Sequence, residues 1–405
     1  MAKKLIIIGG GSAGCFAAVT AAENGADVIL IEKNPSIGKK ILATGNGRCN
    51  YCHDKVTYDD LFRPEGDEFL SKVMKSISPE DVLDKFRTLG ITPVSRDGYI
   101  YPYSEQARAV SDVLKRAVAR SGVKLYTDTE VTDIIKKKNG FTVICEGKEF
   151  DTDTVLITTG GKAAPNTGSD GRGLDICKKL GHKVITPVPA LTYLKIEDHP
   201  YKKAAGTRLS ATVSIEVSGK VLSSDTGQIQ ITKNGISGIP AFNICRFASR
   251  GLLNREKVKL RIRLVPDMDD ETLKAEITER ICAEGTTPYD ALIGLFPDTF
   301  ADSLLKNAGI APDRIPDNEK KTAGKLSEYL KDITLNVIGT GDFTEAQVTC
   351  GGISLDEVDP STMESKKVPG LFLAGEILDI DGKCGGYNLY FAWASGYIAG
   401  KNGGA

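Results

Sequence analysis

Apolar residues near the N-terminus occur in continuous runs rather than in alternation. Leu5–Ile8 and Val28–Ile31 are both continuous, and the segment between them, Ala13–Ala22, consists mostly of small residues. Continuous apolar runs of this length are typical of parallel strands covered on both faces, and the segment between them predicts a crossover helix. The pattern therefore predicts an α/β, Rossmann-like domain at this end of the chain.

The middle of the chain has a different pattern of apolar and polar residues. Between about residues 190 and 266, the segments LTYLKI, ATVSIEV, KVLSS, GQIQIT and VKLRIRLV alternate in polarity and are separated by Gly, Asp or Asn. This pattern predicts the strands of an antiparallel barrel or sandwich. From 269 to 330 the pattern becomes helical, since Leu273, Ile277 and Ile281 recur every four positions. ITLNVIGTGD (333–342) then predicts a further strand.

Two later segments, one of them near the C-terminus, again show the pattern of the N-terminal segment. Thr154–Gly161 and Leu371–Ala374 are short apolar strands that run into glycines, and a helix is predicted from about Asn388. We therefore expect one Rossmann-like domain to be split by a β domain, which itself carries a helical insert. The predicted bounds are 1–189 and 346–405 for the nucleotide-binding domain, 190–266 and 333–345 for the β domain, and 267–332 for the helical subdomain.

The first glycine turn has the spacing of a dinucleotide-binding fingerprint. Gly9, Gly11 and Gly14 give GxGxxG between the first strand and the first helix, where they allow a tight turn, approach of a pyrophosphate and close helix packing. The N-terminal N–H groups of that helix favour phosphate. Glu32 ends the next strand, 23 residues after Gly9. A carboxylate there fits the ribose hydroxyls of FAD or NAD and disfavours a 2′-phosphate.

Three further glycine-rich clusters follow: GKKILATGNGRCN (38–50), TTGG (158–161) and AGEILDIDGKCGGYNL (374–389). The first lacks bulky residues between Ala43 and Gly47 and has the cation Arg48 beside it, which suits a flat, phosphorylated cofactor. The last places Gly385 and Gly386 before a helix N-terminus, which is another anion site.

Together with AQVTCGGI (346–353), these motifs resemble the BaiN/YhiN-like family of FAD-dependent oxidoreductases over nearly the whole chain. The resemblance implies a non-covalent FAD whose pyrimidine end faces the last helix. Two departures are Cys52, where Thr is usual, and Cys384, where Thr or Ser is common. The implied cofactor-binding residues are Gly9, Gly11, Ser12, Ala13, Gly14, Glu32, Lys33, Lys40, Thr44, Gly45, Gly47, Arg48, Cys49, Asn50, Val131, Thr159, Gly160, Gly161, Gly375, Glu376, Asp381, Gly386, Tyr387, Asn388 and Leu389.

The resemblance also implies the reaction. NADH or NADPH would bind transiently, and hydride would pass through the flavin to an unsaturated or carbonyl-conjugated small molecule held between the domains. Arg48, Tyr101 and Tyr387 are the candidate catalytic residues. The aromatic segment 96–103 could form a wall for a flat substrate or an ordinary hairpin edge. Residues 240–243 could line the cleft or cap a helix that packs on the barrel.

Other functions remain open at this stage. Cys49 and Cys52 form a C-x-x-C, which is compatible with a thiol–disulfide reductase, although no second GxGxxG lies between 162 and 348. The family also includes amine oxidase-type activity, and RNA-modification factors share this flavin fold.

Composition excludes several classes. Among 405 residues, 41% are hydrophobic and 26% charged, and a formal net charge of −1 gives no field that would attract nucleic acid. No apolar run reaches about 18 residues, so no membrane span is expected. Nine scattered cysteines do not resemble a secreted disulfide framework, so we expect a cytoplasmic protein. The sequence leaves the oligomeric state open.

Only three histidines are present, so a metal site or a Ser-His-Asp hydrolase has little support. We expect His182 to cap a helix C-terminus and His199 to be exposed, while His53 adjoins the predicted flavin loop.

Overall fold

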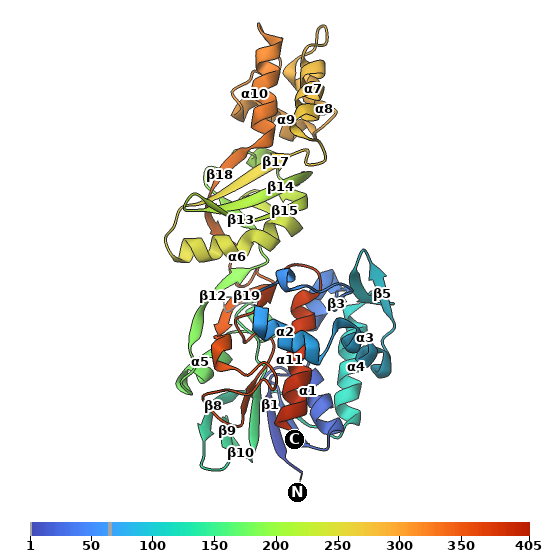
Figure 1. Ribbon diagram of the computed structural model, residues 1–405, viewed down its shortest axis with the longest axis vertical. Coiled ribbons are helices and arrows are strands. Elements are labelled where there is room, and N and C mark those ends of the chain that lie inside the picture. The colour runs from blue at the N-terminus through green and yellow to red at the C-terminus, as the bar shows by residue number, and fades with distance from the viewer. Residues whose placement is uncertain (1, 64–66) are drawn as a thin grey trace. The chain divides into compact units, whose positions relative to one another are not determined.

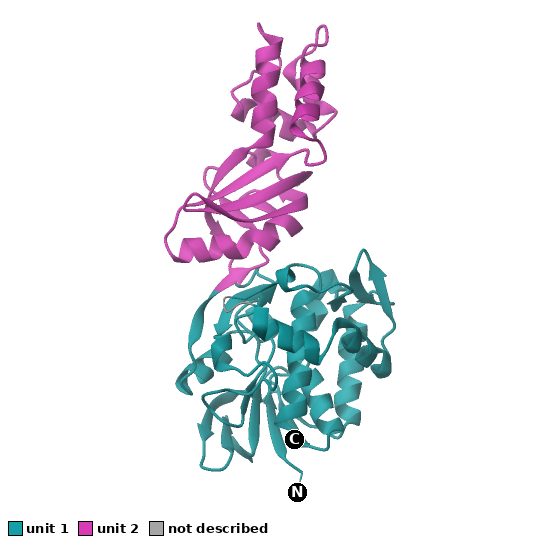
Figure 2. Ribbon diagram, in the orientation of Figure 1, with its two compact units in different colours: residues 1–187, 343–405 teal, residues 188–342 magenta. Residues whose placement is uncertain are grey.

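A computed structural model describes residues 2–63 and 67–405, which form two compact units. Unit 1 contains residues 1–187 and 343–405, and unit 2 contains residues 188–342 (Figures 1 and 2). Each unit has its own hydrophobic core. The second unit is therefore an insertion into the chain of the first.

Unit 1 is built on a parallel sheet in the order β20-β11-β1-β2-β7. Its central strands β1 (Lys4–Ile8) and β2 (Asp27–Ile31) pair in register, and helix α1 (Ser12–Glu23) connects them. The predicted α/β, Rossmann-like architecture is confirmed, as is the antiparallel β insert described below. The other strands of the sheet are β7 (Lys124–Tyr126), β11 (Thr154–Ile157) and β20 (Leu371–Leu373).

Helix α11 (Tyr387–Gly403) lies beside α1 with very little space between the two backbones (Figure 1). A Cβ atom on Gly396 would lie 2.5 Å from the carbonyl oxygen of Ala13, and one on Gly400 would lie 2.4 Å from that of Ala17. Only glycine allows this approach, because real Cβ atoms do not come so close to a backbone oxygen. The close packing places the N-terminus of α11 in the same unit as the GxGxxG turn.

The rest of unit 1 surrounds this sheet and helix pair. A short hairpin of β5 (Pro93–Arg96) and β6 (Tyr99–Pro102) pairs with β3 (Cys52–His53), just after the 3-10 segment η1 (Lys40–Gly47). The remaining elements are β4 (Leu61–Phe62), α2 (Asp67–Ser76), α3 (Pro79–Leu89), α4 (Ala107–Arg120), β8 (Val131–Lys136), β9 (Phe141–Cys145), β10 (Lys148–Thr152), α5 (Arg172–Lys179), β19 (Val348–Ile353) and β21 (Asp381–Gly382). Strand β12 (Val184–Ala190) begins in unit 1 and ends in unit 2.

Unit 2 begins with a closed antiparallel barrel in the order β13-β16-β15-β14-β17-β18. The segments KVLSS and GQIQIT, which the sequence suggests are two strands, form the single strand β15 (Lys220–Ile231). It pairs along its length with β14 (Arg208–Val217), so cross-strand pairing outweighs the Asp and Gly in its middle. The other strands are β13 (Leu194–Ile196), β16 (Gly235–Gly238), β17 (Val258–Leu264) and β18 (Ile333–Thr340).

Residues 240–243 lie in the first turn of helix α6 (Ile239–Leu253), which packs against the barrel. Pro240, Ala241 and Asn243 are buried, and the Asn243 side chain donates a 2.6 Å hydrogen bond to Asp225 of β15. Three of the four residues therefore contribute to the packing of α6 within unit 2.

Four helices complete unit 2: α7 (Asp270–Ile281), α8 (Pro288–Ile293), α9 (Asp298–Asn307) and α10 (Glu319–Lys331). The predicted helical period in α7 is correct, because Leu273, Ile277 and Ile281 are fully buried. Segment 267–332 is acidic, with 15 Asp and Glu against 8 Lys and Arg. Among the residues described, no helix is both long and apolar enough to span a membrane.

The prediction that His182 caps the C-terminus of α5 is confirmed for its backbone, because its N–H donates to the carbonyl of Cys177 at 3.0 Å. Its ring is buried between Glu357 (Nδ1 to Oε2, 2.9 Å) and Ser365 (Nε2 to Oγ, 3.0 Å). The prediction for His199 is wrong. His199 is not exposed but 5% accessible, and neither ring nitrogen has a hydrogen-bond partner among the described residues. Local sequence could not reveal either burial, because the residues that cover each ring come from distant segments.

Candidate functional site

The turn between β1 and α1 has the geometry of a phosphate site. Gly9 has φ of +103°, and a Cβ on Gly14 would lie 1.9 Å from the carbonyl oxygen of Gly9. A Cβ on Gly11 would meet nothing within 4 Å, so the space in front of the helix is open. The first-turn N–H groups of α1, including those of Ser12 and Ala13, are directed at this space, and no side chain caps them.

Glu32 lies directly after β2 and holds the glycine turn. One carboxylate oxygen accepts the Gly10 N–H at 2.7 Å, and the other accepts both the backbone N–H (2.8 Å) and the side-chain amide (2.6 Å) of Asn34. Glu32 is only 7% accessible. Because a carboxylate has about four acceptor positions, one remains for a ribose hydroxyl.

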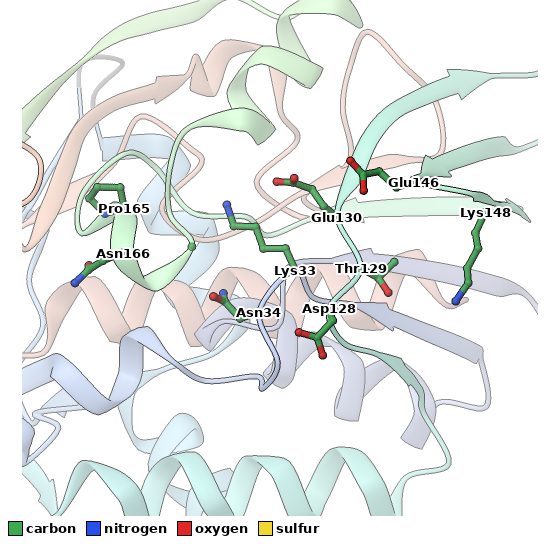
Figure 3. Close-up of a pocket in the computed structure, with 10 residues that line it drawn as sticks. Lys33, Asn34, Asp128, Thr129, Glu130, Glu146, Lys148, Pro165 and Asn166 are labelled. Carbon is green, nitrogen blue, oxygen red and sulfur yellow. The ribbon is translucent and has the colours of Figure 1, made fainter.

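A pocket of about 410 Å³ is lined by Lys33 and Asn34, the two residues that follow Glu32 (Figure 3). Of the predicted residues, Lys33 lines it and is held by Asp170, 2.7 Å away. Val131 lines a separate, smaller hollow of about 150 Å³, directly after the pocket residue Glu130. The lining residues that the sequence did not suggest are Asn34, Asp128, Thr129, Glu130, Glu146, Lys148, Pro165, Asn166 and Gly168. Asn34, Asp128, Thr129 and Glu130 are sequence neighbours of Glu32 or Val131, which is a signal that could have found them, whereas the other five come from distant segments.

The predicted flavin loop, η1 and the residues after it, runs through left-handed backbone. Gly45, Asn46 and Cys49 have φ of +55°, +53° and +58°, and a Cβ on Gly47 would meet nothing within 4 Å. The Thr44 hydroxyl donates to the carbonyl of Ile41 at 2.6 Å within the loop. At Gly45 and Gly47, which are both exposed, the loop therefore presents bare backbone.

Lys40 and Glu376, both predicted to bind cofactor, bind each other. Lys40 Nζ lies 2.7 Å from Glu376 Oε2 and 3.1 Å from the carbonyl oxygen of Ala163. The second Glu376 oxygen accepts the Thr349 N–H at 2.9 Å. This ion pair therefore joins η1 to the loop after β20 and to β19.

The TTGG segment and the loop after β20 also come close to the glycine turn. The Thr159 hydroxyl is buried without a hydrogen-bond partner among the described residues, beside Gly160 with φ of +75°. A Cβ on Gly161 would lie 2.4 Å from the Thr349 hydroxyl, and one on Gly375 would lie 2.9 Å from the Cβ of Ala13. Glycine is needed at both positions.

Helix α11 begins against the segment that follows η1. Gly386 has φ of +88°, and a Cβ there would lie 2.4 Å from the carbonyl oxygen of Cys52 and 2.8 Å from Asn50 Oδ1. The Asn388 amide binds the N–H and carbonyl of Gly382, at 2.7 and 2.9 Å, so its backbone N–H is what remains for a ligand. The N–H groups of Tyr387 and Leu389 lie in the same first turn, and Asp381 is buried in β21 nearby.

The three candidate catalytic residues all contact the region around β6. The Arg48 guanidinium lies 5.0 Å from the centre of the Tyr101 ring and 3.7 Å from the Glu105 carboxylate. Tyr387 stacks on His53, which contacts Tyr99, also on β6. Since residues two apart in a strand share a face, β6 joins the Arg48 and Tyr387 groups.

The two cysteines of the C-x-x-C do not have the properties of a redox pair. Cys49 and Cys52 are both fully buried, and burial raises the pKa of each thiol to about 12. Because the thiolate is the reactive form, neither is an effective nucleophile near neutral pH. The thiol–disulfide alternative is therefore not favoured.

These features fit FAD. Two helix N-termini and two glycine loops offer backbone N–H groups, and the buried oxygens of Asn50 and Thr159 have no partner among the described residues. Buried polar atoms are normally paired, so unpaired ones beside open backbone indicate ligand contacts. In the described part of the chain, no group of three or more His, Cys, Asp or Glu could hold a metal ion.

Comparison with known proteins gives matches over the length of the chain. Residues 3–402 match the family described as HI0933-like protein Rossmann domain. The chain is 40% identical over 404 residues to the 3-dehydro-bile acid delta(4,6)-reductase of Clostridium scindens, covering 98% of each. It is 26% identical over 401 residues to the ribosomal RNA dihydrouridine synthase of Escherichia coli, covering 98% of this chain and 97% of the other. The structure of 3-ketosteroid delta1-dehydrogenase from Sterolibacterium denitrificans shares the fold, with a TM-score of 0.50, 13% identity and 99% coverage of both chains.

Proposed function

The chain belongs to the HI0933-like family, and from this membership we propose that it reduces a conjugated carbonyl compound, with NADH or NADPH as the hydride donor. The resemblance carried by the glycine-rich motifs is confirmed, and the chain is an FAD-dependent oxidoreductase. The donor, the substrate class and the roles of individual residues are the parts that we propose.

One observation carries the substrate class. The relative that is 40% identical over 98% of both chains is named a delta(4,6)-reductase of a 3-dehydro-bile acid, which is a reaction on carbon–carbon double bonds conjugated to a ketone. Identity at this level over the full length favours a related reaction here. The proposed substrate is accordingly a flat, largely apolar molecule with such a conjugated system.

FAD supplies hydride transfer at its flavin ring when it is bound. The residues around it then have separate tasks. The first turn of α1 binds the pyrophosphate, and Glu32 accepts a hydrogen bond from one ribose hydroxyl. The positive end of α11 favours negative charge in front of Gly386.

The chain must also deliver a proton to the substrate. Burial, with Asp60 and Tyr99 as further contributors, raises the pKa of Tyr387, so its phenol stays protonated and can act as a donor. The Arg48 guanidinium stabilises the oxygen anion that forms on the substrate carbonyl. Tyr101 holds the Arg48 guanidinium against its ring.

We propose a small-molecule substrate rather than a nucleic acid. The relatives named as ribosomal RNA dihydrouridine synthases are 26% and 27% identical, well below the bile-acid reductase. Segment 267–332 also has an excess of seven negative charges, which would repel a phosphate backbone. We place this activity in the cytoplasm, which fractionation of the source cells can test.

The proposal is tested with the purified protein. Its flavin spectrum is first recorded before and after anaerobic addition of NADH or NADPH, and we expect one of them to bleach the flavin. The reduced protein is then mixed with a 3-oxo-4-ene steroid or with an unmodified ribosomal RNA fragment, and the oxidised protein is mixed anaerobically with a simple primary amine. Reoxidation by the steroid alone supports the proposal. Reoxidation by the RNA, or reduction of the flavin by the amine, would replace it with the corresponding activity.

A further inference from the structure

Three rings meet at the N-terminus of α11, and we name His53, Tyr99 and Tyr387 the three-ring cluster. The His53 and Tyr387 rings are stacked, with centroids 4.9 Å apart and planes at 18°. The Tyr99 ring meets the His53 ring edge-on, with centroids 5.4 Å apart and planes at 83°. The rings come from three separate segments: β3, β6 and α11. His53 therefore lies between the hairpin and the helix that carries the proposed proton donor.

Two glycines leave space for this arrangement. A Cβ on Gly98 would lie 2.6 Å from His53 Cε1 and 2.8 Å from Nε2. A Cβ on Gly385 would lie 2.5 Å from Tyr387 Cε2 and 3.0 Å from Tyr99 Cε1. Any side chain at either position would push the rings apart, so the backbone on both sides of the cluster is fitted to it.

The His53 ring is held from its own strand. The Lys55 N–H donates to Nδ1 at 3.0 Å, so the lone pair of Nδ1 is occupied and the proton of the neutral ring is on Nε2. Asp54 Oδ1 lies 3.3 Å from the same nitrogen. The side chain is 14% accessible, so packing and this hydrogen bond fix the plane of the ring.

Tyr387 has no comparable restraint of its own. No residue in the described ranges forms a hydrogen bond with its hydroxyl, although the residue is only 9% accessible. Asp60, a further charged group near it, is engaged with Lys383 (3.2 Å) and Thr57 (2.7 Å). The direction of the Tyr387 phenol is thus set by the rings that it packs against.

We infer that His53 is a positioning residue for Tyr387: the stacked imidazole holds the phenol in the direction needed for proton delivery. This rests on the proposed function, in which Tyr387 is the proton donor. A flat ring at position 53 is what the inference requires, and an imidazole nitrogen is not. That requirement separates positioning from direct acid–base chemistry by His53.

The test compares four variants: H53A, H53F, Y387F and H53A/Y387F. Stopped-flow absorbance measures two rates separately, namely reduction of the flavin by the pyridine nucleotide and its reoxidation by a 3-oxo-4-ene steroid. Y387F should slow reoxidation by about 10²-fold or more, as expected for loss of a general acid. H53A should slow it by about 10- to 100-fold through misplacement of the donor. H53F should recover most of that loss. In H53A and H53F, flavin content and the rate of flavin reduction should stay as in the parent protein.

The double variant is the decisive one. If His53 acts through Tyr387, H53A should add almost nothing once the hydroxyl has been removed by Y387F. Equal defects in H53A and H53F, a full additional loss in the double variant, or a parallel loss of flavin would each overturn the inference. A parent protein that its donor reduces but no conjugated steroid reoxidises would overturn the proposed function, and this inference with it.

Discussion

At the scale of single residues, Tyr51 and Trp393 form a matched pair in the core of unit 1. The Trp393 indole donates a 2.8 Å hydrogen bond to the Tyr51 carbonyl, whereas the buried Tyr51 hydroxyl has no partner among the described residues. Y51F should therefore leave the free energy of unfolding unchanged or raise it, by up to about 2 kcal/mol, because it removes an unpaired polar group. W393F should lower it by about 2–4 kcal/mol through the lost bond and a cavity. Urea unfolding followed by circular dichroism distinguishes them, and a marked loss in Y51F would show that the hydroxyl is paired.

Glu32 offers a second test at this scale. Its two oxygens hold Gly10 and Asn34 in place, so E32A should release the glycine turn as well as the ribose contact. We expect the purified variant to retain at least about tenfold less flavin, while E32Q, which keeps one acceptor oxygen, loses less. The measurement is flavin absorbance per mole of protein. Full flavin content in E32A would contradict the ribose assignment.

At the scale of secondary-structure elements, the packing of α11 on α1 depends on glycines at the contact. G400A places a methyl group 2.4 Å from the backbone of α1, so we expect a loss of about 1–3 kcal/mol in stability, accompanied by weaker flavin retention. The control is G324A in α10, where a Cβ would meet nothing within 4 Å. A helix gains up to about 1 kcal/mol from this exchange when there is room. Thermal unfolding of the two variants should shift in opposite directions, and a stabilised G400A would show that the helices can separate.

Local chemistry explains which elements the sequence predicts well. The GxGxxG turn, Glu32 and the buried period of Leu273, Ile277 and Ile281 are fixed by neighbours close in sequence, and they are where the sequence suggests. The length of strand β15 is not predicted correctly. Asp225 and Gly227 favour the end of a strand locally, but both residues pair with β14 and the strand continues through them. Long-range pairing outweighs local preference in such a case.

At the scale of the whole molecule, the same distinction applies to the site. The glycine loops can be predicted from the sequence because each of them is one short segment. The three-ring cluster cannot be predicted in this way. His53, Tyr99 and Tyr387 are separated by up to 334 positions in the sequence, and only the fold brings them together. Likewise, Lys40 and Glu376 each lie in a glycine-rich motif, yet nothing in either motif shows that the two side chains form an ion pair. Motifs therefore predict the conformation of short loops better than they predict contacts between distant residues.

The two buried histidines make the stability of the whole chain depend on pH. Burial lowers the pKa of His182 and of His199, although Glu357 opposes this effect at His182 and the nearby Thr232 backbone opposes it at His199. Both rings therefore take up protons at a lower pH in the folded protein than in the unfolded chain, where protonation sets in as the pH falls below about 6.5. The unfolded state then binds more protons, so stability falls as pH decreases below that value, by at most about 1.4 kcal/mol per pH unit for each histidine.

Glu357 does not obscure this effect between pH 6.5 and 5. Its carboxylate accepts from Lys183 and pairs with Lys367 at 2.6 Å, and its pKa is lowered, so its own contribution is lost only in stronger acid. Urea unfolding at pH 7.5, 6.5 and 5.5 measures the dependence. H199L removes one buried titrating group, one that lacks hydrogen-bond partners among the described residues, so it should reduce the slope and not lower stability at pH 7.5. An unchanged slope in H199L would mean that His199 is protonated in the fold, and that its burial is offset by a partner that forms only with the charged ring.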